Sequence, residues 1–411
     1  MHNKYFPQLI GAILLSSSIG AFAQAPAGPV KPTYEIPTGD NQSKDGPRGW
    51  PLADGVALYP SIDAAYGRDD NMFLTPSNEK SSNFYTLAPG LKLQARKASS
   101  IYTLDYTGKW GRYTDSRADD YSDYHVGGIG EFTFSSRQGL RLGAEFNKGH
   151  DPRGSTDRPD AVKPDKFKNS GINGLYAYGG NEARGRIELE GGSYRKHYVN
   201  NRSSTFVSDR DTNSFAGRIF ARVTDKSSLL FEARGTKLNY TSPTSLADSS
   251  EQRYLAGVAW EATAATSGII KVGQIRKNFV SNSIKDFRGT GWDALVKWAP
   301  LTYSRLDFFT AKDFNESTGV GDFILTKRYG ANWTHDWNSR LSTSANISRV
   351  DDEFINAGRN DSTDSIGLKL NYKVQRWLTI GGEFLNADRD SNISNFRYKR
   401  NIYSLFVGAT L

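Results

Sequence analysis

The sequence predicts an all-β protein: a transmembrane antiparallel β-barrel of about 18 strands, with short periplasmic turns and longer extracellular loops. Three observations predict it. Apolar and polar residues alternate with period two through most of the chain, short and long connections alternate between these runs, and the last residues form an amphipathic strand that reaches the C-terminus. Each part of the chain supports this fold in turn.

The N-terminus predicts an export signal over residues 1–23. Lys4 precedes an apolar run at 9–15, and Ala-Phe-Ala at 21–23 forms a small-x-small cleavage site. Residues 24–54 are rich in Pro and Gly and lack periodicity, which predicts a flexible periplasmic leader. The barrel is expected over 55–411. Mean hydropathy is −0.58, too polar for a helical membrane protein.

The barrel strands are predicted from one apolar face alternating with a polar, often charged face. In "IYTLDYTGKW" (101–110) the aromatic and leucine side chains share one face, and "SIGLKLNYKV" (365–374) repeats the pattern. The runs are about ten residues long, the length that crosses a bilayer at a tilt. The alternation is blurred at 268–276 and 304–311. Because hydrocarbon satisfies no backbone hydrogen bond, such a sheet has to close on itself.

The connections show a second regularity. Short turns are expected at 96–100, 135–139, 179–182, 224–228, 263–267, 299–303, 334–339 and 374–376. Longer polar loops are expected at 67–82, 113–122, 148–169, 196–212, 240–252, 277–288, 312–321, 350–362 and 387–398. These seventeen connections give about 18 strands, and they place both chain termini of the barrel in the periplasm.

Aromatic residues and the C-terminal strand agree with this topology. Trp292 and Trp298 share a face six residues apart, roughly 20 Å along a strand, close to the height of the apolar band of a barrel. They are interpreted as interfacial girdle residues. "YSLFVGATL" (403–411) resembles the terminal strand that the barrel-assembly machinery reads in outer-membrane proteins, with Leu411 in place of the usual aromatic residue. The predicted location is the outer membrane of a Gram-negative-type bacterium.

The charged residues are expected to face the lumen, because facing lipid is costly for them. The predicted lumen-lining residues are Arg186, Glu188, Glu190, Arg218, Arg222, Glu232, Arg234, Lys369 and Lys373. Two interpretations stay open. The charges either pair across strands and hold a solvated interior, or they shape a path for a polar solute.

Composition and motifs argue against several other functions. The net charge of +8 is interspersed rather than gathered in basic blocks, which does not favour nucleic-acid binding. The sequence has no cysteine, no G-x-S-x-G and no histidine cluster, so no catalytic residue, metal site or cofactor is predicted. A less favoured alternative is an outer-membrane lipid- or glycan-modifying enzyme, with His125 or His150 beside a serine and a carboxylate.

The first predicted strand and its neighbours carry a family resemblance. "YPSIDAAYGRDDNMFLTP" (59–76), followed by "SSNFYTLAPGLKLQAR" (81–96), resembles the opening of the second outer-membrane beta-barrel porin family. The resemblance implies a barrel associated with exopolysaccharide or capsule loci. It implies a non-enzymatic conduit or accessory component for export of a surface polysaccharide, with a periplasmic polysaccharide-export protein as partner.

Asp69, Asp70 and Asn71 within this motif are interpreted as turn and rim residues, or as a rim site for a cation that bridges lipopolysaccharide. Outer-membrane lipid and lipopolysaccharide are the expected surroundings. The main alternative function is a general or solute-selective diffusion porin, with the loop at 148–169 folded into the lumen as a constriction. A surface scaffold with a plugged barrel is a further alternative.

Overall fold

The computed structural model describes residues 49–411 apart from 157, 159–160, 181–182 and 264, so the expected signal peptide and most of the expected leader lie outside the described residues. The strands are β1 (Trp50–Ala53), β2 (Val56–Asp69), β3 (Ser82–Lys97), β4 (Ser100–Tyr113), β5 (Tyr121–Ser135), β6 (Gln138–Asp151), β7 (Asp165–Tyr178), β8 (Gly185–Tyr198), β9 (Arg210–Thr224), β10 (Ser227–Tyr240), β11 (Ser249–Thr263), β12 (Thr266–Phe279), β13 (Phe287–Leu301), β14 (Ser304–Asn315), β15 (Ile324–Asp336), β16 (Leu341–Phe354), β17 (Arg359–Gln375), β18 (Leu378–Ser391) and β19 (Tyr398–Thr410). One short helix, α1 (Arg202–Thr205), and three 3-10 turns, η1 (Arg117–Asp119), η2 (Phe206–Ser208) and η3 (Ser394–Phe396), lie in the loops. No helix among the described residues is long and apolar enough to cross a membrane.

The strands from β2 to β19 form a closed antiparallel barrel of 18 strands, which confirms the predicted fold. Each strand pairs with the next one along the chain, and β19 pairs with β2 from Ser61 to Asp69 to close the sheet. β1 pairs with the first residues of β2, with Trp50 opposite Leu58. The structure therefore places a short strand at the end of the segment expected to be a leader.

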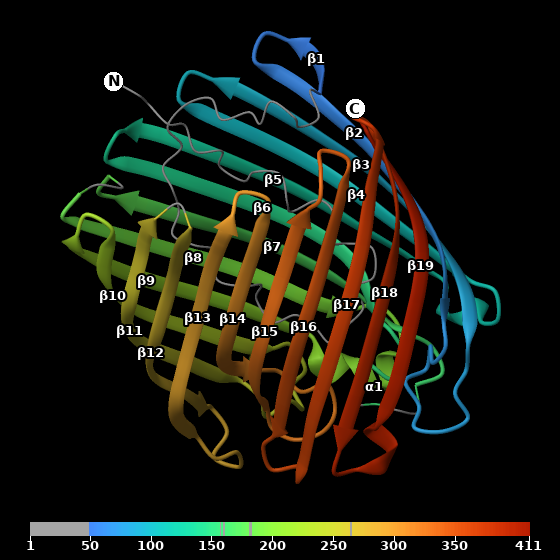
Figure 1. The fold of residues 1–411 in the computed structure, drawn as a ribbon. Coiled ribbons are helices and arrows are strands. Elements are labelled where there is room, and N and C mark those ends of the chain that lie inside the picture. Colours follow the sequence, from blue (N-terminus) through green and yellow to red (C-terminus); the bar gives the residue numbers. More distant parts are fainter. Residues whose placement is uncertain (1–48, 157, 159–160, 181–182, 264) are drawn as a thin grey trace.

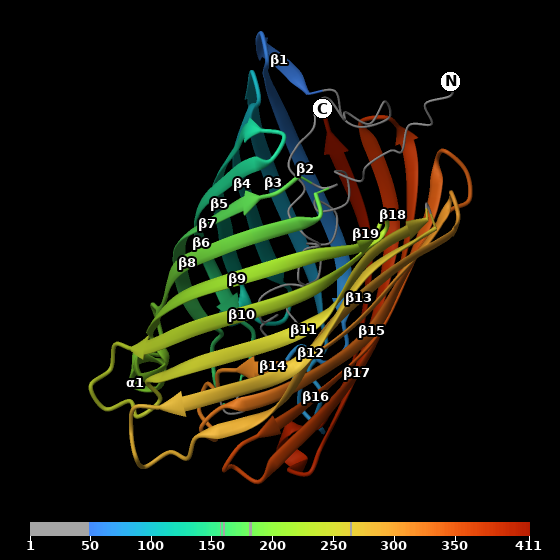
Figure 2. The ribbon, with the colours of Figure 1, turned by 90° about the vertical axis from the view of Figure 1, so that its left-hand side faces the viewer.

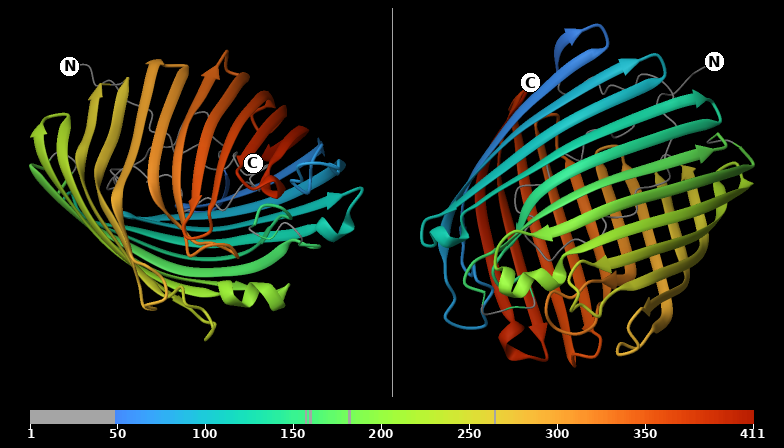
Figure 3. Two further views of the ribbon diagram at one scale, coloured as in Figure 1. Left: turned by 90° about the horizontal axis from the view of Figure 1, so that it is seen from below. Right: turned by 180° about the vertical axis from the view of Figure 1, so that it is seen from behind.

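The barrel is flattened rather than round. The strands from β2 to β8 form one broad wall and those from β13 to β19 form the other, as Figures 1 and 3 show. The walls meet at the β19–β2 seam and at a bend around β9–β12, which Figure 2 shows edge-on. The C-terminus and β1 lie at the end of the barrel that carries the short turns, and the longer loops and α1 lie at the other end. The end with the short turns is the periplasmic end in the predicted topology.

The barrel strands from β2 to β19 are longer than predicted, at 12 to 17 residues. The segment 148–169, expected to be a loop, contributes its first residues to β6 and its last to β7, and the two strands pair as far as Asp151 and Asp165. The reason is that hydrophobic alternation reports contact with lipid, whereas backbone pairing continues beyond the membrane. Period two therefore locates the strands but underestimates their external ends.

Candidate functional site: the charged lumen wall

The two faces of the sheet differ in chemistry, as the alternation predicts. Apolar side chains such as Leu104, Phe215 and Leu405 are exposed on the outer face. Charged side chains occupy the alternate positions, which face the lumen. The register places opposite charges directly across from one another: Lys92 opposite Asp105, Glu131 opposite Arg141, Lys271 opposite Asp293, Lys297 opposite Asp307 and Lys369 opposite Glu383. Directly opposite side chains on one face are close enough to interact.

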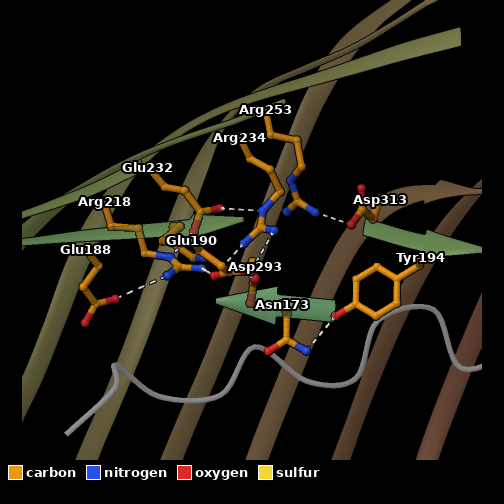
Figure 4. Close-up of polar contacts among 11 residues, drawn as sticks. Asn173, Glu188, Glu190, Tyr194, Arg218, Glu232, Arg234, Arg253, Asp293 and Asp313 are labelled. Carbon is orange, nitrogen blue, oxygen red and sulfur yellow. Dashed lines mark hydrogen bonds and ion pairs between the residues drawn. The ribbon is translucent and has the colours of Figure 1, made fainter. Parts of the chain in front are cut away.

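Arg218 on β9 is the centre of the most extensive ion-pair network (Figure 4). It lies opposite Glu188 on β8 and opposite Glu232 on β10. Its Nε lies 2.7 Å from Glu232 Oε2, its Nη1 lies 3.3 Å from Glu188 Oε2, and its Nη2 donates to Glu190. Arg234 also binds Glu190, with 3.2 Å between Nη1 and Oε1. One guanidinium thus contacts three carboxylates on two neighbouring strands.

The network continues to β12 and β13 through Lys271. Its Nζ lies 3.4 Å from Glu232 Oε2 and 3.4 Å from Asp293 Oδ2. Glu188, Glu232 and Lys271 are only 1%, 2% and 1% exposed. Buried charges of this kind persist only when they are paired and hydrogen-bonded. These members of the network therefore brace the wall, and passing solutes do not reach them.

The bend of the barrel explains why lumen-facing charges are so buried. The ion pair between Lys271 and Glu232 spans β11, where Gly257 lies opposite Lys271. A Cβ at Gly257 would lie 1.8 Å from the carbonyl oxygen of Ile270, so only glycine permits this approach of β11 and β12. The ion pair between Arg253 and Asp313 joins β11 to β14 across the same bend.

Three of the other four predicted lumen residues lie apart from this network. Arg186 joins it, with its Nη2 2.8 Å from Glu188 Oε1. Arg222 lies near the periplasmic turn, where its guanidinium donates to the carbonyl oxygen of Asp225 at 3.0 Å. Lys369 lies on β17 in the opposite wall, 4.5 Å from the ring centroid of Phe406, and Lys373 is exposed four residues nearer the periplasmic end of β17. The predicted set is therefore one network plus three separate positions.

The predicted set omits Lys271, although its ammonium links the two halves of the network. It lies in the segment 268–276, where the apolar run around it hides the alternation of the strand. Its neighbours Ile270 and Val272 are exposed on the outer face. A strict count of alternate positions through this run would have placed Lys271 in the lumen.

The Asp69-Asp70-Asn71 motif lies at the seam between the first and last strands of the barrel. Arg400 Nε donates to Asp69 Oδ1 at 3.0 Å, and Asn401 donates to both Asp70 oxygens at 2.6 and 2.8 Å. Asn71 Nδ2 donates to the Lys399 carbonyl oxygen at 2.9 Å. The carboxylate oxygens that a cation would need already accept protein hydrogen bonds. Among the described residues, no group of three or more potential ligands is arranged for a metal ion.

The described part of the segment 148–169, which was expected to fold into the lumen as a constriction, pairs in β6 and β7 and contacts neighbouring loops. Lys168 is on the outer face of β7, two residues from Ser170 and four from the exposed Ile172. In the described part of the loop, Arg153 stacks on Phe73 at 3.6 Å and binds Asp119, so it contacts neighbouring loops. Lys168 therefore belongs to β7 and not to a loop, because the strand extends further than its hydrophobic pattern.

A different loop contacts the inner wall: residues 316–323, between β14 and β15. Phe323 is 0% exposed and packs against Phe279, Phe287 and Phe314, with ring centroids 5.6 to 5.9 Å away. Glu316 Oε1 lies 2.6 Å from Lys277 Nζ, and Glu316 Oε2 accepts a hydrogen bond from Tyr240.

The Glu316 carboxylate is held in its ionised form. Burial raises the pKa of Glu316, but the Lys277 ammonium, Arg210 and the hydrogen bonds from Lys277 and Tyr240 lower it by more, so the pKa lies below its usual value. This loop is thus fixed to the inside of the extracellular mouth by charge and aromatic packing together.

The histidines of the enzyme alternative have other partners. His125 uses both ring nitrogens, with Nε2 2.9 Å from Asp105 Oδ2 and Nδ1 2.5 Å from Asn147 Oδ1. His150 Nδ1 lies 2.8 Å from Asp123 Oδ2, and its ring stacks on Tyr121. Neither arrangement is that of a base next to a serine nucleophile.

Comparisons with known proteins agree with this architecture. Residues 55–411 match the protein family described as "Putative beta-barrel porin 2". No curated protein matches the chain. Acinetobacter baumannii OccAB3 has a similar structure, with a TM-score of 0.50 and 12% identity over 87% of this chain and 100% of that one. Pseudomonas aeruginosa OccK2 (OpdF) also has a TM-score of 0.50, with 13% identity over 87% of this chain and 98% of that one. At these identities the likeness is one of fold.

Proposed function

Since the chain belongs to the beta-barrel porin 2 family and is a porin-like β-barrel of the bacterial outer membrane, we propose that its lumen conducts small polar solutes without catalysis. The proposal includes weak selectivity between cations and anions. A polar lumen enclosed by an apolar outer face is the arrangement that a water-filled channel requires.

The in-register charge pairs of the lumen carry this proposal. Lys92 and Asp105, Lys297 and Asp307, and Lys369 and Glu383 lie directly opposite one another on both walls. Each pair is neutral as a unit, so the wall has little net field along the lumen. A channel selective for cations or for anions needs rings or clusters of fixed charges of the sign opposite to that of the ion. The wall therefore favours polar solutes in general over one charged substrate.

Conductance in planar bilayers tests the proposal. The purified protein is expected to give discrete conductance steps with a reversal potential close to zero in a salt gradient. Lys369→Gln leaves Glu383 without its in-register partner and should shift the reversal potential toward cation selectivity. Lys399→Gln is the matched control, because Lys399 pairs with Asp388 on the outer face. A barrel that stays silent at all voltages would contradict the proposal.

Export of a surface polysaccharide is the second candidate, and it is supported by β1. β1 pairs with the same edge of β2 as β19 does, at residues of β2 that lie beyond the end of β19. It exposes Trp50 and Leu52, at 62% and 56%, at the end that carries the short turns. A periplasmic export protein would meet this apolar edge first.

Deletion of the gene with complementation separates the two candidates. Loss of polysaccharide from the surface with polymer retained inside supports export, and it predicts that Trp50→Ala with Leu52→Ala reproduces the loss. Unchanged polysaccharide at both locations, with conductance present, contradicts export and leaves the diffusion channel as the remaining candidate function.

A further inference from the structure

We propose that the outer face of the barrel binds the phosphate groups of lipopolysaccharide at a site built around Lys148 and Lys168. This inference is independent of what passes through the lumen. It starts from the register of β6 and β7, which places these two lysines directly opposite one another. Like charges in directly opposite positions destabilise a sheet. An anion between them removes that repulsion.

Both lysines face outward. Lys148 shares its face of β6 with Leu142 and Phe146, and Lys168 shares its face of β7 with Ile172. Leu142 and Ile172 are 46% and 63% exposed on the lipid side. The inner face is marked by Asn147, which binds the lumen histidine His125.

The height of the pair fits the outer leaflet. Ile172 lies opposite Ala144, and the lysines lie four residues further toward the extracellular end of both strands, roughly 13 Å along them. Tyr124 lies opposite Lys148, with its ring centroid 5.8 Å from the ammonium, and it stacks on Phe146. Aromatic rings with a polar end are typical of the interface. The ammonium groups therefore lie where lipid phosphates lie.

Among the described residues, carboxylates do not neutralise the pair. Two carboxylates further along the sheet are engaged elsewhere: Asp211 binds Arg195 through both oxygens, and Asp209 binds His197 and Arg202. Within the part of the chain that the structure describes, no ion pair joins Lys148 or Lys168 to a carboxylate. His197 lies opposite Lys168 and continues the row.

The chemistry points to a phosphorylated glycolipid. Ammonium groups bind phosphate as point charges, and basic clusters at the membrane surface recognise anionic headgroups. Lipid A has phosphate groups at the base of its sugars, at the same depth as the lysines. Its acyl chains would cover the exposed Leu142 and Ile172.

Binding of purified lipid A to the protein in nanodiscs free of lipopolysaccharide tests the proposal. The wild type should bind bisphosphorylated lipid A more tightly than dephosphorylated lipid A. The double change Lys148→Gln with Lys168→Gln should weaken binding about ten- to thirtyfold. Lys399→Gln is the control, because Lys399 is also an exposed outer-face lysine but has Asp388 opposite it. Heat-modifiable migration on gels shows that every variant is folded.

Lys168→Glu gives a second test, because it should change stability and lipid A binding in opposite directions. It creates an opposite-charge pair with Lys148, so it should raise the unfolding midpoint in lipid-free detergent while it abolishes lipid A binding. The proposal is overturned if the double variant binds lipid A as the wild type does. It is also overturned if dephosphorylated lipid A or phosphatidylglycerol binds as tightly as bisphosphorylated lipid A.

Discussion

On the inner and outer faces of this barrel, the cross-strand register brings different combinations of charged residues opposite one another. Inside, Glu188 and Glu232 lie opposite Arg218, and Lys369 lies opposite Glu383. Outside, Lys148 lies opposite Lys168. The same backbone spacing thus holds attractive pairs on the inner face, whereas the outer face holds attractive pairs such as Lys399 and Asp388 together with this repulsive pair.

The difference follows from what surrounds each face. The lumen wall has no external counter-charge fixed to it, and at the bend its charges are buried, so the protein has to supply both partners. The outer face at its extracellular end meets a lipid layer rich in phosphate. There an unpaired cation has a partner outside the protein. The sign of an in-register pair therefore indicates whether its neutralisation is internal or external.

The largest effect is expected from Arg218→Met. This change leaves Glu188 and Glu232 buried without their shared guanidinium, so the free energy of unfolding should fall by about 3–5 kcal/mol. Denaturant unfolding of the folded barrel measures it. Arg222→Met, on the same face of β9 but only half-buried and outside the network, should cost less than about 1 kcal/mol. Equal losses for the two variants would mean that the network is not a brace.

The next effect concerns the loop at 316–323. Because the pKa of Glu316 is lowered in the folded protein, its ion pair contributes stability that is present above the ordinary value of 4.5 and is lost as pH falls through the lower folded value. Limited proteolysis of the loop should therefore increase as the pH falls below this ordinary value and through the lower pKa of the folded protein. Glu316→Gln should weaken the anchor by about 1–3 kcal/mol at neutral pH, less than a full uncompensated charge because Glu251 still binds Lys277. Cleavage independent of pH in the wild type would contradict this.

A charge reversal inside the lumen should change the free energy of unfolding in the opposite direction to Lys168→Glu on the outer face. Lys369→Glu places two carboxylates directly opposite each other and removes the contact between the Lys369 ammonium and the Phe406 ring. The free energy of unfolding in lipid-free detergent should fall by about 1 kcal/mol. If both reversals change stability in the same direction, the contrast between the faces fails.

The smallest effect is expected at a second outer pair. Lys312 lies opposite Lys327, and its ammonium is 5.7 Å from the ring centroid of Trp292. Asp351 on the next strand, β16, lies opposite Lys327, so the protein partly neutralises this lysine pair. Lys312→Gln with Lys327→Gln should therefore weaken lipid A binding about fivefold or less. A larger loss than at Lys148 and Lys168 would place the main phosphate site on the other wall.

Much of the fold could be predicted from alternation, because every strand that faces lipid on one side repeats every two residues. The outward placement of Tyr102, Leu368 and Leu405 and the inward placement of Glu188 and Arg218 follow from that period. The extent of the strands could not be predicted, since pairing beyond the membrane leaves no apolar mark. The segment 148–169, which includes Lys168, was therefore expected to be a loop, and the inner-wall contacts of Glu316 and Phe323 were not anticipated.

By itself the sequence determined the barrel, its strand number and the face on which each regular strand places its charges, because alternation and connection length are local properties. Only the tertiary structure decided which charges meet. The bend permitted by Gly257 brings Lys271 to Glu232, closure brings Arg400 to Asp69, and register sets Lys148 against Lys168. These contacts join residues of different strands, and their geometry depends on curvature, closure and register, which no local pattern records.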